Sequence, residues 1–218
     1  LETNLMHSFE NKENHLGAVV PPIFQNSLFT YESWEAIDAA FDDRTNNYIY
    51  SRGKNPTVRL VEEKLAELAG GEQAQLFPSG MAAITASCLH ALEPNAHIIA
   101  IKNLYGPANN LLSNYLPRKM NTTVTFVSGE DVQDFENAIQ ENTKLIYLES
   151  PSTAIFSLQN IPEITKLAKK HGIKTIIDNT WATSIFQPAI AMGIDLEVHS
   201  CSKYLGGHSD IIGGVVIG

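Results

Sequence analysis

The sequence predicts an α/β fold with a mostly parallel sheet and helices on both faces. From about residue 75 onward, short apolar runs alternate with longer segments of helical character. The apolar runs are largely uninterrupted, as expected for parallel strands that are buried on both faces. Hydrophobic residues make up 44% of the 218 residues and charged residues 18%, which is enough apolar material for a sizeable core.

The first 50 residues are expected to be irregular apart from one short helix at 32–41. Pro21 and Pro22 break any helix near the start, and Ser33 is suited to cap the helix that follows it. A long segment with little regular structure is often an arm that packs on another body. Here that body is either a partner subunit or the domain of the same chain.

The first clear helix is expected at 56–69. Asn55 is a good N-cap, Pro56 suits the first helical position, and Gly70 ends the pattern. Four apolar residues fall on one stripe of this helix, namely Val58, Val61, Leu65 and Leu68.

Strands and helices then alternate to the end of the chain. Apolar runs predict strands at 75–77, 97–101, 123–127, 144–149, 174–178, 196–200 and 211–217. Periodic segments predict helices at 82–92, 107–116, 131–141 and 161–171. Asp131 marks one helix start, while Pro162 and Gly172 bracket the last helix.

Charge and composition narrow the class of protein. The formal charge is −9 and the chain has no block of Lys and Arg, so binding to nucleic acid is not expected. No apolar run approaches 18 residues, and the first seven residues lack the features of a signal peptide. Cys88 and Cys201 are the only cysteines, which predicts reduced thiols in a cytosolic protein.

The stretch 199–208 carries the strongest chemical signal. It places Ser200, Ser202 and Lys203 directly after a predicted strand and before a pair of glycines. The two hydroxyls can bind a phosphate beside the amine, and a partly desolvated lysine is a usable nucleophile. Such a lysine can form a Schiff base with pyridoxal phosphate (PLP). The alternative is an ordinary surface lysine.

Other polar residues follow predicted strands, where ligands bind in parallel sheets. The turn 78–81 leads into a helix whose free N–H groups suit a phosphate, although many such turns bind nothing. Asp178 ends an apolar run and would need a cationic partner, such as a pyridinium nitrogen, or else bonds to backbone or a metal. Tyr105 either stacks on a planar cofactor or packs in the core. His199 and His208 lack a credible set of metal ligands, so no metal is expected.

Taken together, these segments resemble the Cys/Met-metabolism PLP-dependent enzymes, the transsulfuration family with the fold-type I aminotransferase-like architecture. The resemblance covers nearly the whole chain and rests on six segments in order, which are Tyr50-Ser51-Arg52, Ser79-Gly80-Met81, Tyr105-Gly106, Glu149-Ser150-Pro151, Asp178-Asn179-Thr180 and Ser200-x-Ser202-Lys203-Tyr204.

The resemblance implies a role for each candidate. Lys203 would be the Schiff-base lysine, Asp178 the partner of the pyridine nitrogen and Tyr105 the residue stacked on the ring. The phosphate would be held by Gly80, Met81, Ser200 and Ser202, and by Tyr50 and Arg52 of a neighbouring subunit. Residues 1–52 would then be an arm on that subunit and 53–218 the PLP-binding large domain, in a homodimer or homotetramer with shared active sites.

Three departures from the family pattern refine the expectation. Ser152-Thr153-Ala154 stands where many members have Thr-Asn-Pro, and Trp181 stands where γ-acting members commonly have Phe. Both features look more like cystathionine β-lyases. Family members also continue past the position of Gly218 into a small C-terminal domain, which carries the arginine that holds the substrate carboxylate and is absent from this chain.

The expected activity is therefore that of a PLP-dependent C–S lyase. The resemblance implies β-elimination of cystathionine, or of a cysteine-like substrate, to a thiol, pyruvate and ammonia. The alternatives are a γ-acting relative, which is a cystathionine or methionine γ-lyase, a cystathionine γ-synthase or an O-acylhomoserine sulfhydrylase, and an inactive or truncated binding fragment. A nicotinamide-binding domain fits poorly, because no Gly-x-Gly-x-x-Gly follows a strand.

Overall fold

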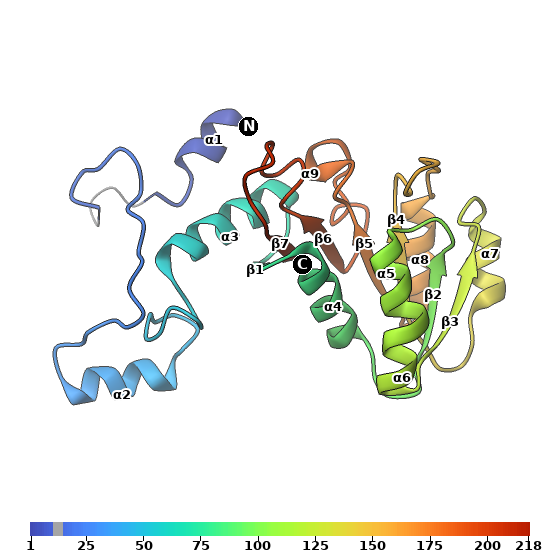
Figure 1. Ribbon diagram of the computed structural model, residues 1–218, viewed down its shortest axis with the longest axis horizontal. Coiled ribbons are helices and arrows are strands. Elements are labelled where there is room, and N and C mark those ends of the chain that lie inside the picture. The colour runs from blue at the N-terminus through green and yellow to red at the C-terminus, as the bar shows by residue number, and fades with distance from the viewer. Residues whose placement is uncertain (11–14) are drawn as a thin grey trace. The chain divides into compact units, whose positions relative to one another are not determined.

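The computed structural model describes residues 1–10 and 15–218, which form two compact units (Figure 1). Unit 1 comprises Leu1–Leu65 and unit 2 comprises Ala66–Gly218. The division falls inside helix α3 (Pro56–Ala69), whereas the sequence placed the end of the arm at residue 52. Among the described residues, no helix is long and apolar enough to cross a membrane.

The described part of unit 1 contains two short helices besides the start of α3. Helix α2 (Trp34–Asp42) confirms the prediction at 32–41, and the hydroxyl of Ser33 caps it by accepting the N–H of Ala36. Helix α1 (Glu2–His7) was not predicted, so the expectation that this region lacks other regular structure was wrong there. Six residues without a side-chain cap or a buried position carry little signal of a helix.

Asn55 organises the junction between the irregular segment of unit 1 and α3. Its side-chain oxygen accepts the N–H of Thr57 at 2.9 Å, which confirms the predicted cap. Its side-chain amide donates to the carbonyl of Phe24 at 2.9 Å, and the N–H of Phe24 donates to Thr57 Oγ1. One polar side chain therefore starts the helix and also fixes the preceding chain against it.

Unit 2 is built on a mixed sheet whose described strands run in the order β1-β7-β6-β5-β4-β2-β3. Strands β2 to β6 pair in parallel, while β7 pairs antiparallel with both β1 and β6. The mostly parallel sheet is therefore confirmed. The bounds of the strands are β1 (Ala74–Phe77), β2 (His97–Ile101), β3 (Thr123–Val127), β4 (Thr143–Glu149), β5 (Lys174–Asp178), β6 (Leu196–Ser200) and β7 (Gly214–Ile217).

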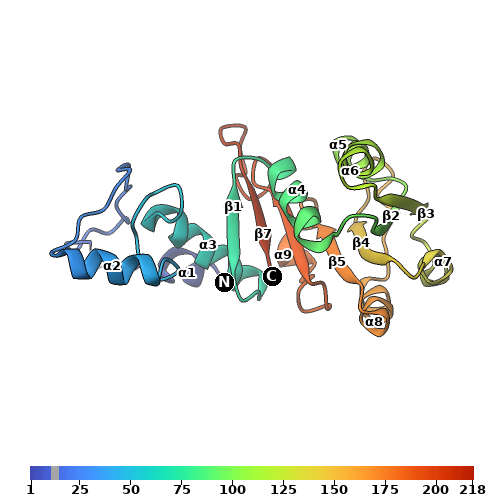
Figure 2. The same ribbon diagram turned by 90° about the horizontal axis from the view of Figure 1, so that it is seen from below.

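Helices cover both faces of this sheet, as predicted (Figure 2). On one face lie α4 (Gly80–Ala91), α5 (Gly106–Asn110) and α6 (Leu116–Met120), and on the other lie α7 (Val132–Ala138) and α8 (Ile161–His171). The central strands β2, β4 and β5 are almost fully buried between these layers, and each buried Ile or Leu contributes roughly 1.5–3 kcal/mol. The wholly buried aliphatic strand residues include Ile98, Ile99, Leu145, Ile146, Ile176 and Ile177.

The helix predicted at 107–116 is longer and irregular. It runs as α5, a π-helical turn at Leu111–Tyr115 and α6. Pro117 stands at the start of α6 and has no N–H to complete the regular α-helical ladder, so a widened turn precedes it. No local pattern of residues predicts that the chain resumes as a helix beyond this proline.

Other boundaries also differ from the predictions. Helix α7 is shorter than 131–141, because a turn in which Thr143 and Gln140 bond each other leads into β4. The strand predicted at 211–217 begins only at Gly214. Gly213 instead bonds back to Cys201 and Ser202, so the residues before β7 belong to a loop. A short helix, α9 (Thr183–Phe186), was not predicted.

His97 is a buried titratable group at the amino end of β2. Its two ring nitrogens lie 2.8 Å from Thr143 Oγ1 and 2.8 Å from Thr125 Oγ1, on the two neighbouring strands. Burial lowers the pKa of His97 below its ordinary value. Folding therefore favours the neutral ring over the protonated one, relative to the unfolded chain.

The pKa of His97 predicts part of the pH dependence of stability. The unfolded chain binds a proton on His97 near pH 6.5, whereas the folded chain binds it only at a lower pH, so this residue destabilises the fold as the pH falls. We expect the free energy of unfolding in urea to fall less between about pH 7 and pH 5 in His97→Asn than in the wild type. The control is His171→Asn, at the exposed end of α8. Equal pH dependence in His97→Asn and the wild type would contradict the prediction.

Candidate functional site

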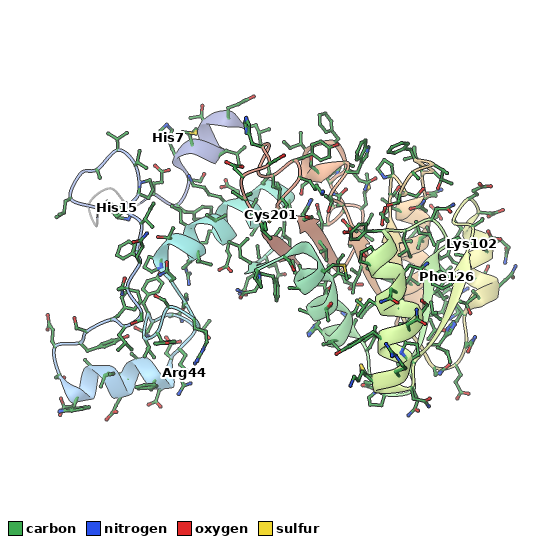
Figure 3. The ribbon with its side chains drawn as sticks, in the orientation of Figure 1. His7, His15, Arg44, Lys102, Phe126 and Cys201 are labelled. Carbon is green, nitrogen blue, oxygen red and sulfur yellow. The ribbon has the colours of Figure 1, made fainter. Side chains whose placement is uncertain are left out.

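The candidate residues of unit 2 gather at the carboxyl ends of the parallel strands, at the top of Figure 1. The loops after β4, β5 and β6 and helix α9 all lie at this edge. Figure 3 shows Cys201 at the end of β6 and Lys102 at the end of β2, which mark the edge at two positions. Asp178 closes β5 and Ser200 closes β6, so the topology alone brings these two together.

The start of α4 lies directly against the end of β6. A Cβ atom on Gly80 would stand 2.8 Å from Cβ of Ser200, which is closer than two carbon atoms can pack. A Cβ atom on Gly214 would stand 2.3 Å from the carbonyl oxygen of Ser79. Glycine is required at both positions because the backbones of α4, β6 and β7 approach one another so closely.

This packing gathers hydrogen-bond donors around one point. Ser79 caps α4 by accepting the N–H of Ala82, while the N–H groups of Gly80 and Met81 find no acceptor in the described chain. Ser200 Oγ, held against Gly80, also has no hydrogen-bond partner among the described residues. A helix start with free N–H groups and a nearby hydroxyl is suited to an anion such as a phosphate.

Ser202 contributes a further hydroxyl from the turn after β6. Its Oγ accepts the N–H of Gly213 at 3.3 Å, so its own hydrogen stays available for donation. Lys203 follows in the same turn, with its N–H donating to the carbonyl of Ser200 at 3.2 Å. The amine of Lys203 is exposed and has no partner among the described residues, rather than being partly desolvated as expected. The reason is its place in a turn beyond the edge of the sheet.

Asp178 is the buried carboxylate of this edge. Its Oδ1 accepts both the N–H of Thr180 at 3.1 Å and the hydroxyl of Thr180 at 2.5 Å. Burial raises the pKa of Asp178, and the two hydrogen bonds from Thr180 offset part of that rise, with a smaller contribution from His199. Oδ2 accepts no hydrogen bond from any described residue, so one lone-pair site of a buried carboxylate stays open to a cationic N–H.

Thr180 is a residue of the candidate site for which the sequence alone predicted no role. Its hydroxyl donates to Asp178, and its oxygen accepts the N–H of Ser200 at 2.9 Å. One side chain therefore joins the end of β5 to the end of β6. A Thr two residues after an Asp is the pattern of a local side-chain turn, which could have indicated this role.

Glu149 is a second residue of the candidate site for which the sequence predicted no role. It closes β4 and is almost fully buried, and its Oε2 accepts the N–H of Tyr105 at 2.7 Å. Burial raises the pKa of Glu149, while hydrogen bonds from Thr153 and Tyr105 partly offset the rise. An acidic residue ending an apolar run, as in Asp178, was the signal available in the sequence.

The remaining candidates are Tyr105 of unit 2 and two residues of unit 1. Tyr105 is 47% exposed, so it is not a core residue. Tyr50 and Arg52 belong to unit 1, where the Arg52 guanidinium lies 4.9 Å from the centre of the Tyr50 ring. Among the described residues, no group of three His, Cys, Asp or Glu side chains could hold a metal ion.

The site therefore has the donors for a phosphate, a buried carboxylate with an open oxygen and a lysine amine at one sheet edge. These features define the class of α/β proteins that hold a phosphorylated ring cofactor, and each fits PLP. The phosphate suits the helix start and the serine hydroxyls, and the protonated ring nitrogen suits Asp178 Oδ2.

Comparison with known proteins identifies the family. The family model of the Cys/Met metabolism PLP-dependent enzymes matches residues 2–218. The L-methionine gamma-lyase of Pseudomonas putida is 36% identical over 216 residues, which cover 99% of this chain and 54% of that protein. The cystathionine beta-lyase of Staphylococcus haemolyticus is 40% identical over 197 residues, which cover 90% and 48%.

A solved structure agrees with these sequence matches. It is an O-acetylhomoserine (thiol)-lyase from Campylobacter jejuni that carries N'-pyridoxyl-lysine-5'-monophosphate. It superposes with a TM-score of 0.92 at 31% identity and covers 99% of this chain and 53% of its own. The chain belongs to the Cys/Met-metabolism family of PLP-dependent enzymes, and it spans about half the length of the relatives that it matches.

The close approach of Gly80 to Ser200 predicts that any larger residue at position 80 destabilises the fold. We expect Gly80→Ala to lower the free energy of unfolding by roughly 1–3 kcal/mol, because the new methyl group overlaps a packed strand end. Gly106→Ala is the matched control, since it also starts a helix after a strand and nothing lies within 4 Å of its Cβ position. Urea unfolding measures both variants. Equal stability of the two would show that the close approach is not a constraint.

The bonds of Thr180 predict a change in the titration of Asp178. Thr180→Val removes the hydroxyl that donates to the carboxylate, and this hydrogen bond lowers the pKa of Asp178. We therefore expect a higher pKa for Asp178 in Thr180→Val, measured by NMR titration of its carboxyl carbon without added PLP. Thr180→Ser keeps the hydroxyl and should stay near the wild-type value. An unchanged pKa in Thr180→Val would refute this account.

Proposed function

We propose that the protein to which this chain belongs is a PLP-dependent carbon–sulfur lyase. Its reaction would be β-elimination of cystathionine, or of a cysteine-like substrate, which together with one water gives a thiol, pyruvate and ammonia. The observation that carries the proposal is the open Oδ2 of the buried Asp178, at the same sheet edge as the free donors of the α4 start and the Lys203 amine. Family membership and relatives with lyase names support it.

The proposal assigns the phosphate of PLP to four residues. The N–H groups of Gly80 and Met81 would donate to it from the helix start, and the hydroxyls of Ser200 and Ser202 would donate from the end of β6 and its turn. None of these donors is consumed by another acceptor in the described chain. The close approach of Gly80 to Ser200 would keep the donors of α4 and β6 oriented before the phosphate arrives.

The ring would be held by Asp178 and Tyr105. Asp178 would accept a hydrogen bond at Oδ2 and so keep the ring nitrogen protonated, while Thr180 holds its other oxygen. Tyr105 would lie on the ring face, with its backbone fixed by Glu149. When bound, PLP supplies the electron sink that makes the substrate Cα proton acidic.

Lys203 would hold the cofactor covalently and then act as the general base. Its amine would take the proton from the substrate Cα once the substrate amine has replaced it. Release of the thiolate from Cβ would follow. The Lys203 amine has no partner among the described residues, so no hydrogen bond or ion pair there competes with either role.

A γ-acting lyase is the second candidate. It is favoured by the match to the L-methionine gamma-lyase of Pseudomonas putida, which is comparable to the match to the cystathionine beta-lyase.

Trp181 favours the β-lyase over the γ-lyase, as the resemblance implied. Its ring packs 4.9 Å from Phe156 and 5.4 Å from Tyr204, the neighbour of Lys203.

We further propose that unit 1 is an arm that packs on a second copy, with Tyr50 and Arg52 reaching the phosphate in the neighbouring site. The support is an unusual share of exposed apolar side chains in this unit. They include Val19, Val20, Ile23, Leu28 and Trp34, each at least 65% exposed. Burial of these residues on a partner would make a dimer or tetramer the active form.

Lys203 is tested by covalent labelling. The full-length protein incubated with PLP and reduced with borohydride should carry the pyridoxyl group on Lys203, as mapped by peptide mass spectrometry. Lys203→Ala should lose the label and at least a thousandfold in kcat, on the order of the loss of a combined nucleophile and base. Lys102→Ala, also at the carboxyl edge, is the control and should keep the label. A label on any other lysine would overturn the assignment.

The two candidate reactions are separated by their keto acids. With cystathionine as substrate, β-elimination releases homocysteine and pyruvate, whereas γ-elimination releases cysteine and 2-oxobutanoate. We expect pyruvate as the main product, quantified by chromatography of the hydrazone derivatives. If 2-oxobutanoate is the main product, the protein is a γ-lyase and the β-lyase proposal is wrong. If neither keto acid forms, the lyase proposal fails and an inactive binding protein is the alternative that remains.

A further inference from the structure

A wholly buried carboxylate stands behind the candidate site. Glu197 lies in β6 with no exposed surface, and its Oε1 accepts three hydrogen bonds. The donors are Asn179 Nδ2 at 2.7 Å, Ser184 Oγ at 2.6 Å and His199 Nε2 at 2.8 Å. Oε2 of Glu197 and Nδ1 of His199 are buried without partners in the described chain. Burying a carboxylate is costly, so its retention needs a reason.

The register of the sheet shows that Glu197 does not share the face of Asp178. Asp178 pairs with Val198, and Ile177 pairs with Glu197. Side chains alternate along a strand, so Glu197 projects to the opposite face from Asp178. Glu197 therefore acts on Asp178 only through other residues.

Asn179 provides the connection. It stands between Asp178 and Thr180, and its backbone N–H donates to the carbonyl of Val198 at 2.9 Å. Its side-chain oxygen accepts Gln187 Nε2 at 2.9 Å, while its amide donates to Glu197. With every polar group of Asn179 bonded, the backbone that presents Asp178 and Thr180 has little freedom to shift.

The same network reaches the end of β4. Gln187 Nε2 donates to the carbonyl of Ser150 at 2.7 Å as well as to Asn179. Ser184 of α9 bonds Glu197, so the segment after Asp178 is fastened at both ends. The ends of three parallel strands are thus joined beneath the site by one set of buried hydrogen bonds.

We propose that Glu197 is a positioning residue for the cofactor site, which holds Asn179 and thereby fixes the carboxylate of Asp178 where the cofactor ring nitrogen binds. The inference rests on the proposed function, because it assumes that Asp178 meets that nitrogen. It adds a residue that touches neither substrate nor cofactor. Neutralising it should weaken the site without removing any cofactor contact.

The experiment compares PLP affinity in variants of the full-length protein. Glu197→Gln keeps the shape but loses the charge, and we expect its dissociation constant for PLP to rise about tenfold, as for a lost hydrogen bond to a charged group. Ser184→Ala removes one donor and should raise it roughly threefold, which tests the network even if Glu197→Gln fails to fold. His97→Asn is the control, since His97 is equally buried but at the amino ends of the strands.

Hydrogen exchange of the Ser200 amide, without PLP, provides a second measurement. This N–H bonds to Thr180 Oγ1, so a looser 178–180 segment should speed its exchange in Glu197→Gln and Ser184→Ala but not in His97→Asn. If both Glu197→Gln and Ser184→Ala bind PLP within twofold of the wild-type affinity, the inference about Glu197 is wrong, while the proposed function still stands. An equal loss in His97→Asn would also overturn the inference. A wild type that takes up no PLP at Lys203 would overturn the proposed function and this inference together.

Discussion

The candidate site depends on the two hydrogen bonds that the hydroxyl of Thr180 makes. This hydroxyl donates to the buried carboxylate of Asp178 and accepts the N–H of Ser200, so it links the two strand ends that carry the charge and the phosphate donors. Because Ser200 also touches Gly80, the link extends to the start of α4. A single side chain thus sets the spacing between the part of the site that suits a ring and the part that suits a phosphate.

Most of the fold was predictable because its signals are local. Uninterrupted apolar strands, the Asn55 cap and the turn at Gly80 are each encoded within a few residues. The errors have equally physical causes. The continuation past Pro117 needs a widened helical turn, and the late start of β7 follows from contacts of Gly213 with residues that are distant in sequence. Such long-range contacts leave no trace in a local pattern.

The candidate site likewise contains residues that local signals predict and residues whose role depends on long-range contacts. Ser200, Asp178 and Gly80 were predicted from their positions after strands, and the structure brings these three together. Glu197 was not predicted, because a charged residue in an alternating strand reads as a solvent-facing position. Only the register with β5 and the cover provided by α9 reveal that it is buried. Supporting residues are harder to predict than those that bear the chemistry, since their role depends on their neighbours in space.

The place of β7 in the sheet has a consequence for synthesis of the chain. Of the described strands, β1 is the first to leave the ribosome, yet its partner is β7, and Ala74 pairs with Ile217. Until β7 emerges, β1 has no neighbour to complete its ladder, and β6 keeps an open edge. An unpaired strand edge is a site of aggregation. Nascent chains that already contain β6 but not yet β7 are therefore expected to require chaperone protection most.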